Sequence, residues 1–483
     1  MANQDTKVIT LNIHGDKVAV RYEKDTSEPE DLILGDKELN LKVLNFCNKL
    51  IQADLIQNDQ DFKLIGQLLH KVLFTKTVKH DFNLVRAIAN RPRVELEFTG
   101  NDSRGLSSLP WEYLCYEEGD DNWRFLSTVT ELVLTRYLQP NAAAPKVVKL
   151  KPGQIDVLLV VLNPDPVRMD DLAMVERHVK DQLDKYRQAM AKQKIEVVVD
   201  QVTPPVTWER FSKKINEMDC RPHILHLIAH GKFDGEGKKD RSGKIAFHLT
   251  DEPEEIEVGV VGGNIDMIRD RTFVNLFAEA HKLPRFAFLH MCEGGAIDKH
   301  DTSAGVALCL AQEGVPAVVA MQHKIEIETS IIFSETFYQA LGNAQTIDEA
   351  VQDGRRKIAE KNAHNRAFGT PVLYLSLRSD PILPIVEKHV DPPPPPPTEL
   401  LDTDFFVGNL LNIILDFPDK KNLSEDKVTS VLAEVKRHLG KSFKELKSEL
   451  EKRITECNQF DKDQLKLTIL YNELLKKIKE LGK

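Results

Sequence analysis

Two short apolar segments each end in a residue that can do chemistry. HILHLIAHG (223–231) ends in His230-Gly231, and FAFLHMCEGG (286–295) carries Cys292 directly after its apolar run. An imidazole beside a thiol can remove the thiol proton, and the thiolate then attacks a carbonyl carbon. Gly231 after the histidine, and Gly294-Gly295 just beyond the cysteine, let a substrate approach the backbone, where the Gly231 and Cys292 amides can hold an oxyanion. The pattern suggests the His-Cys dyad of a cysteine peptidase.

A purely structural interpretation of the same residues stays open at this point. A cysteine at the end of a buried strand often packs as a small apolar side chain, and a histidine before glycine can simply cap a strand. The two residues can meet only if their strands are neighbours. In a parallel sheet, adjacent strands lie about 4.8 Å apart and end at one edge. Spacing alone therefore leaves the His230–Cys292 pairing undecided.

Histidines at 223, 226 and 230 also raise the possibility of a metal site. Strand alternation places His226 and His230 on one face and His223 on the other, which disfavours a shared ion. No CxxC pair occurs among the cysteines, which stand at positions 47, 115, 220, 292, 309 and 457. We therefore expect reduced thiols, and neither structural zinc nor another cofactor is implied.

Strand-like and helical patterns alternate from residue 155 onward. Apolar runs predict strands at 155–163, 195–202, 223–231, 286–292, 315–322 and 371–377. Helical patterns lie at 170–192, 207–218, 303–313, 329–341 and 346–361. This alternation predicts an α/β fold with a mostly parallel sheet covered by helices on both faces. In such sheets functional residues lie at the carboxyl ends of strands, where His230 and Cys292 stand.

The remaining segments suggest three further parts of the chain. Residues 1–150 show mixed α/β patterns, with a strand turn at His14-Gly15-Asp16 and helices at about 38–57 and 61–75. Six prolines follow Asp391 and predict a stiff extended spacer of roughly 19 Å. Residues 399–483 are rich in Leu, Lys and Glu and predict a small helical bundle. We assign 1–150 as an N-terminal region, 151–388 as the main domain, 389–398 as a linker and 399–483 as a partner-binding bundle.

Charge and hydropathy exclude several classes of function. The 483-residue chain has a net charge of −10, which disfavours direct binding to nucleic acid phosphates. Its start lacks a secretory signal, and no apolar run approaches the roughly 18 residues that span a bilayer. We expect a cytoplasmic protein that does not bind membranes.

Several segments together resemble the CHAT peptidases, bacterial relatives of caspases and separase. They are HILHLIAHGKFD, RFAFLHMCEGG, SAGVALCLAQEGVPAVVAMQHKIEIETSIIFSETFYQAL, the closing FGTPVLYLSL, and LPWE at 109–112. In that family one strand ends in His-Gly, and a later strand ends in Cys followed by a polar residue and Gly. The resemblance implies a caspase-like cysteine endopeptidase, with His230 as base, Cys292 as nucleophile, and an oxyanion hole at Gly231 and Cys292.

The sequence departs from the family pattern next to the expected substrate pocket. The family often has Trp where Gln322 or His323 stands. The acidic position that follows is best matched by Glu326, with Glu328 close behind. In separase-like relatives an acid in this region binds a basic P1 side chain, so the resemblance implies cleavage after Arg or Lys. Two solvated carboxylates without a substrate role remain an equal alternative.

The resemblance also implies a biological setting. CHAT proteins in bacteria are commonly coupled to sensing modules in antiviral defence or programmed cell death. Residues 399–483 resemble the adaptors joined to such peptidases in size and helix number only. We expect a protein substrate, and a regulatory partner or self-association through this bundle. The competing hypothesis is a caspase-like scaffold that keeps the dyad idle and signals by assembly.

Overall fold

The chain divides into two compact units, Met1–Val78 with Arg91–His389, and Lys79–Asn90 with Val390–Lys483. The computed structural model describes residues 7–52, 55–56, 59–99, 105–118, 122–140, 153–162, 169–234, 242–250, 265–291, 302–322, 325–361, 366–377 and 383. The predicted proline linker and helical bundle lie outside these residues and stay predictions. Of the second unit, the structure describes most of helix α3 (Lys76–Ile88).

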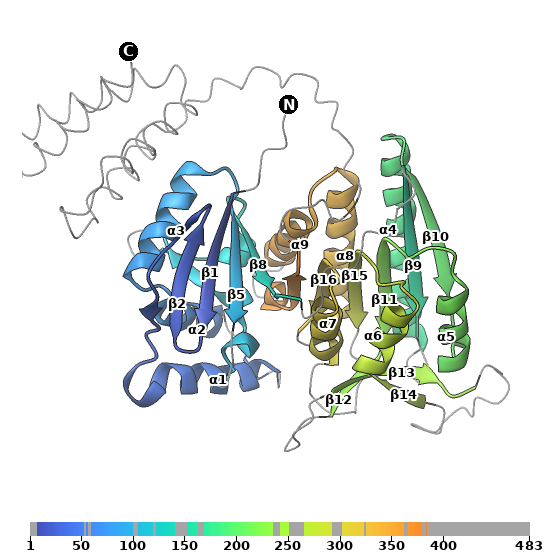
Figure 1. The fold of residues 1–483 in the computed structure, drawn as a ribbon, viewed down its shortest axis with the longest axis horizontal. Helices are drawn as coiled ribbons and strands as arrows, with labels where there is room; N and C mark the ends of the chain where they lie inside the picture. The colour runs from blue at the N-terminus through green and yellow to red at the C-terminus, as the bar shows by residue number, and fades with distance from the viewer. Residues whose placement is uncertain are drawn as a thin grey trace, which may run out of the picture. The chain divides into compact units, whose positions relative to one another are not determined.

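One large sheet forms the framework of the first unit (Figure 1). Its strands are β1 (Val8–His14), β2 (Lys17–Tyr22), β3 (Asp25–Thr26), β4 (Glu30–Asp31), β5 (Arg93–Thr99), β8 (Val133–Tyr137), β9 (Gln154–Val161), β10 (Glu196–Val202), β11 (Ile224–Ala229), β15 (Phe286–Met291), β16 (Ala317–Met321) and β17 (Pro371–Leu375). The order across the sheet is β10-β9-β11-β15-β16-β17-β8-β5-β1-β2-β3, and β4 pairs with β2.

Parallel pairing dominates this sheet, as the alternation of apolar runs predicts. Strands β10, β9, β11, β15 and β16 are mutually parallel, and β17 returns antiparallel to β16. The central strands are buried along nearly their whole length, which is why they appear in the sequence as continuous apolar runs. The predicted fold class, a mostly parallel α/β sheet flanked by helices, is confirmed.

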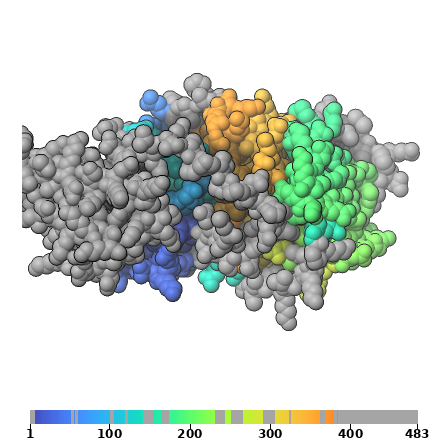
Figure 2. Space-filling model, turned by 90° about the horizontal axis from the view of Figure 1, so that it is seen from above, coloured from blue at the N-terminus to red at the C-terminus, as the bar shows by residue number. Residues whose placement is uncertain are grey.

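Helices complete the layers around the sheet. In chain order they are α1 (Leu39–Gln52), α2 (Asp59–Leu73), α4 (Met169–Ala191), α5 (Trp208–Glu217), α6 (Asp270–Glu279), α7 (Thr302–Gln312), α8 (Ile327–Gly342) and α9 (Ile347–Lys361). Figure 2 shows α4, α8 and α9 next to one another at the surface. No described helix is both long enough and apolar enough to cross a bilayer.

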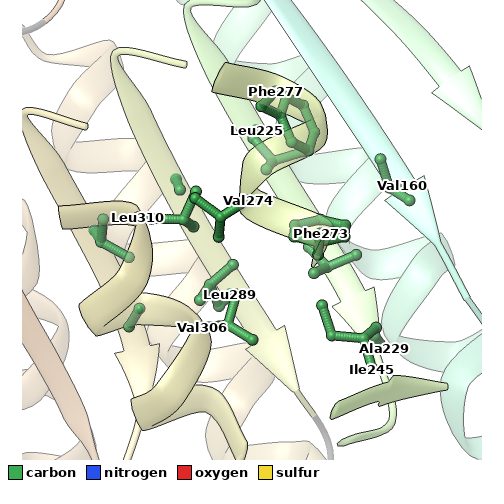
Figure 3. Packing of buried hydrophobic residues seen from close by; sticks show 14 of the residues in the cluster. Val160, Leu225, Ala229, Ile245, Phe273, Val274, Phe277, Leu289, Val306 and Leu310 are labelled. Carbon is green, nitrogen blue, oxygen red and sulfur yellow. The ribbon is translucent and has the colours of Figure 1, made fainter. Parts of the chain in front are cut away.

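Alternate residues of the central strands face two different helical layers. Leu225 and Leu289 belong to an apolar core with Phe273 of α6 and Leu310 of α7 (Figure 3). On the other face, Phe288 packs against aromatic rings of α8. This division follows from the two-residue period of a strand. It determines which side chains lie together at the ends of β11 and β15.

The strands of the N-terminal region continue the same sheet. A tight hairpin joins β1 and β2, with His14 opposite Lys17 and Gly15 in the left-handed region at φ +62°. Strand β5 adds in parallel to β1, and β8 adds in parallel to β5. Strand β8 in turn pairs with β17, so strands from both sides of residue 150 share one sheet. The domain boundary assigned at 150 falls outside the described residues and stays a prediction.

Two smaller sheets complete the described strands. The first is a three-stranded sheet of β12 (Gly231–Asp234), β13 (Ser242–His248) and β14 (Ile265–Arg269). A second pair joins β6 (Cys115–Glu117) to β7 (Trp123–Phe125). The first of these sheets begins at Gly231, directly beyond the end of β11.

Candidate active site

Strands β11 and β15 are parallel neighbours in the sheet. Their register runs from Ile224 opposite Phe286 to Ala229 opposite Met291. Ala229 is the residue before His230, and Met291 is the residue before Cys292. The condition that the sequence left open, adjacency of the two strands, is therefore met. Cys292 itself lies outside the described residues.

His230 lies at the junction between β11 and β12. Its backbone carbonyl accepts a hydrogen bond from the amide of Ala246 in β13, at 3.1 Å. The side chain is half-buried, and its Nε2 atom is shielded from solvent. Gly231, the predicted oxyanion donor, begins β12 opposite Ile245. The local fold therefore holds the His230 backbone between the main sheet and the smaller one.

Glu326 and Glu328 lie at the start of α8, beyond the end of β16. Glu326 is the N-cap residue, and its carbonyl accepts a hydrogen bond from the Ser330 amide at 2.9 Å. Both side chains are exposed. Because β16 is parallel to β15, it ends at the same edge of the sheet as the strands that precede His230 and Cys292. Both predicted substrate-binding residues therefore follow the strand next to β15.

Two buried histidines lie on the α8 face of β11 and β15 and were not singled out as a pair by the sequence. The rings of His226 and His290 are 5.6 Å apart between centroids. Nδ1 of His226 lies 2.6 Å from the hydroxyl of Tyr338 in α8. Burial lowers the pKa of His226 far below its ordinary value and lowers that of His290 to about 3. Both rings are neutral at physiological pH, so neither supplies a positive charge at this face.

A buried polar cluster connects the LPWE segment to the end of β16. Glu112, in the 3-10 turn Trp111–Tyr113, pairs with Arg136 of β8 through both carboxylate oxygens. Nε2 of Gln322 lies 2.6 Å from Oε2 of Glu112. The sequence drew attention to LPWE and to Gln322 separately, but their contact spans 210 positions and becomes visible only in the fold.

Two buried or half-buried thiols outside the predicted dyad, those of Cys115 and Cys309, are poor nucleophiles. Burial raises the pKa of Cys309 in α7 to about 11 and that of Cys115 in β6 to about 12. Both stay protonated at neutral pH, and a thiol attacks carbonyls only as its thiolate. Among the described side chains, no three His, Cys, Asp or Glu residues are grouped as a metal ion would require.

Comparison with known proteins gives one family match and several structural similarities. Gingipain R, an Arg-specific cysteine proteinase, is 12% identical over 80% of this chain and 79% of its own, with a TM-score of 0.35. A complex of the pro- and mature domains of that enzyme from Porphyromonas gingivalis is 12% identical over 72% of this chain and 78% of its own, with a TM-score of 0.33. The Saccharomyces cerevisiae separase–securin complex is 12% identical over 77% of this chain and 30% of its own, with a TM-score of 0.38.

No curated protein matches the chain. The model of the CHAT domain family, however, matches residues 63–393, which include β11, β15, β16 and the LPWE segment. This match covers well over half of the 483 residues. The chain belongs to the CHAT domain family.

Proposed function

We propose that the chain is a cysteine endopeptidase in which His230 is the general base and Cys292 the nucleophile. The observation that carries this proposal is the register of β11 against β15, which places Ala229 opposite Met291. Each of these residues is joined by one peptide unit of about 3.8 Å to a residue of the dyad. His230 and Cys292 are therefore the next residues after two positions that are paired across neighbouring strands.

Strand alternation supports the same pairing. His226 and Phe288 are paired in register, and both pack against α8. Position 230 lies four residues after His226, and position 292 lies four residues after Phe288, so both have the parity of the α8 face. This parity supports a dyad whose two side chains share one face of the sheet.

The reaction follows from these roles. His230 takes the thiol proton, and the sulfur of Cys292 attacks the carbonyl carbon of the scissile peptide. The Gly231 and Cys292 amides stabilise the oxyanion of the tetrahedral intermediate. His230 returns the proton to the leaving amine. Water, deprotonated by His230, then hydrolyses the thioester and releases the acid product.

The neighbouring histidines support the choice of His230 as the base. His290 stands two residues before Cys292, but burial lowers its pKa to about 3, so its ring is neutral at neutral pH. A neutral ring does not lower the pKa of a nearby thiol by charge. His226 lies deeper in the strand and is hydrogen-bonded to Tyr338. His230 is the one of these three that stands at the strand end beside the predicted nucleophile.

We further propose that Glu326 and Glu328 select a basic P1 side chain. They are exposed carboxylates after β16, the strand next to β15. A carboxylate attracts Arg or Lys by charge and can bind the Arg guanidinium through two hydrogen bonds. The proposed substrates are then proteins that are cleaved after Arg or Lys.

Thiol labelling tests the dyad without knowledge of the substrate. Iodoacetamide should label Cys292 faster than a buried thiol, and the His230→Ala variant should slow that labelling, because the thiolate fraction falls. Cys309→Ala is the matched control, since its thiol is protonated and its loss should leave the rate at Cys292 unchanged. Equal labelling of Cys292 with and without His230 would refute the dyad.

The second candidate function is a scaffold that keeps the fold and signals by assembly. It predicts slow labelling of Cys292 that does not depend on His230. Mass spectrometry of proteins co-expressed with the wild type and with Cys292→Ala separates the two functions. Fragments that appear only with the wild type identify a substrate, whereas identical fragment patterns favour the scaffold.

We propose that residues 399–483 bind a regulatory protein or a second copy of the chain in a bacterial defence or cell-death pathway. The support comes from the sequence: a Leu-rich segment with helical patterns follows a run of prolines that predicts a stiff spacer. Deleting 399–483 should abolish association, measured by light scattering and pull-down, while Cys292 keeps its His230-dependent labelling. Association that survives the deletion would count against this role.

A further inference from the structure

Glu112 lies at the centre of a buried cluster of charged side chains. It is 1% exposed, and Arg136 and Arg355 are 3% and 0% exposed. Nε of Arg136 donates to Oε1 of Glu112 at 2.9 Å, and Nη2 of Arg355 lies 3.8 Å from the same oxygen. Burial alone would raise the pKa of Glu112, but the two guanidinium groups hold it below its usual value. Glu112 is therefore an ionised, strong hydrogen-bond acceptor.

Both arginines also have acceptors elsewhere on the backbone. Arg136 donates to the carbonyls of Ser107 and Leu109, and Arg355 donates to those of Leu134 and Pro371. Glu112 is more than a counter-ion for them, because its Oε2 atom also accepts a hydrogen bond from an uncharged donor.

That donor is Gln322, the first residue after β16. Its Nε2 donates to Glu112 at 2.6 Å and to the carbonyl of Gly369 at 2.7 Å. Its Oε1 accepts from Arg136 at 3.2 Å, and its backbone amide donates to Thr370 at 2.9 Å. The side chain is held on both its donor and its acceptor atoms, so its position is closely determined.

Gln322 stands between β16 and the start of α8. Four residues after Gln322, Glu326 caps the N-terminus of α8, and its carbonyl accepts the hydrogen bond from the Ser330 amide. A side chain fixed at the end of β16 limits where this helix can begin. The polar cluster is therefore placed to set the position of the α8 N-terminus.

We propose that Glu112 is a positioning residue that acts through Gln322 to fix the α8 N-terminus, which carries Glu326 and Glu328. The positioning itself is a property of the fold. Its consequence for substrate selection rests on the proposed peptidase function. Glu112 acts from the LPWE segment and from outside the strands that carry the dyad.

Hydrogen exchange of the full chain measures this positioning without any substrate. Glu112→Gln keeps the shape of the side chain but removes its charge, and should speed exchange in the 317–331 peptide about tenfold or more. The amides of Gln322 and Ser330 lie in that peptide. Glu131→Gln, which removes a surface carboxylate paired with Arg124, should change nothing in that peptide.

Gln322→Met keeps the experiment decisive if Glu112→Gln does not fold, because it leaves the Glu112–arginine pairs in place. It should speed exchange in 317–331 and leave the buried β11 and β15 peptides protected. Unchanged exchange in 317–331, or an equal rise in all strands, would overturn the proposal. Labelling of Cys292 reports the dyad separately. Equal labelling in the wild type and in His230→Ala would refute the peptidase and leave the positioning result standing.

Discussion

The hydroxyl of Tyr338 lies 2.6 Å from Nδ1 of His226, and both side chains are fully buried. Tyr338→Phe removes this hydrogen bond and leaves a polar nitrogen without its partner inside the sheet–α8 layer. Such a loss costs about 1–3 kcal/mol of the free energy of unfolding. Urea denaturation at pH 7.5 measures it. Tyr186→Phe removes a hydroxyl from the adjacent ring but leaves the Tyr338–His226 hydrogen bond in place, so it serves as the control, with a smaller expected change.

Acid should destabilise the fold through the buried histidines. Burial holds the pKa of His226 well below 6.5 and that of His290 at about 3, so the folded state stays neutral where the unfolded chain takes up protons. The unfolded state then binds more protons below pH 6.5, and the free energy of unfolding falls as the pH drops from 6.5 toward 3. The slope is at most about 1.4 kcal/mol per pH unit for each histidine.

Replacing one of these rings isolates its contribution to the slope. His290→Leu should reduce the slope of the free energy of unfolding against pH, between pH 6.5 and 5, by the contribution of one histidine. Phe288→Leu shortens a neighbouring side chain without removing a titrating group, and should lower stability equally at every pH. Identical slopes in the wild type and in His290→Leu would contradict the assignment of His290 as a buried neutral ring.

The substrate preference should depend on charge at the start of α8. Glu326→Gln and Glu328→Gln should raise KM for peptides with Arg or Lys at P1, by about tenfold if a charge-assisted hydrogen bond is lost, and should leave kcat nearly unchanged. Peptides with a neutral P1 residue should show the same KM for the variants and the wild type. A uniform fall in kcat for all peptides would instead indicate a structural role.

Close packing beneath the LPWE segment should make Gly66 intolerant of a side chain. A Cβ atom at Gly66 in α2 would lie 2.3 Å from the carbonyl oxygen of Tyr113 and 2.4 Å from Sγ of Cys115. Gly66→Ala should therefore lower the free energy of unfolding by about 1–3 kcal/mol, because backbone must move to make room. Lys63→Ala, at an exposed position one turn earlier, should stay within about 0.5 kcal/mol of the wild type. Thermal unfolding distinguishes the two.

The sequence predicted the central strands well because they are buried on both faces. Continuous apolar runs marked β9, β11 and β15, and the glycine after His230 marked a strand end. The parallel direction of these strands followed from the alternation of strands and helices, whereas the adjacency of β11 and β15 became visible only in the structure. These features depend on local composition and on general rules of α/β topology, and both can be read from one sequence.

Contacts between distant strands were beyond the sequence. Nothing local in Glu112 or Gln322 indicates that they meet, because their contact depends on the order β16-β17-β8 across the sheet. The antiparallel direction of β17 likewise arises from its pairing with β16 rather than from its composition. His290 resembles any polar residue in an apolar run until the packing of α8 shows its burial.

The junction between β17 and β8 has an evolutionary consequence. These strands are matched at only two positions, Tyr374 with Arg136 and Leu375 with Tyr137, whereas β11 and β15 are matched at six. Arg355 of α9 bonds to carbonyls on both sides of this narrow junction, at Leu134 and Pro371. We therefore expect the outer strands β1 to β4 to vary in length and sequence among homologues. Arg136 and Arg355, which stabilise the junction, should be retained wherever these outer strands are present.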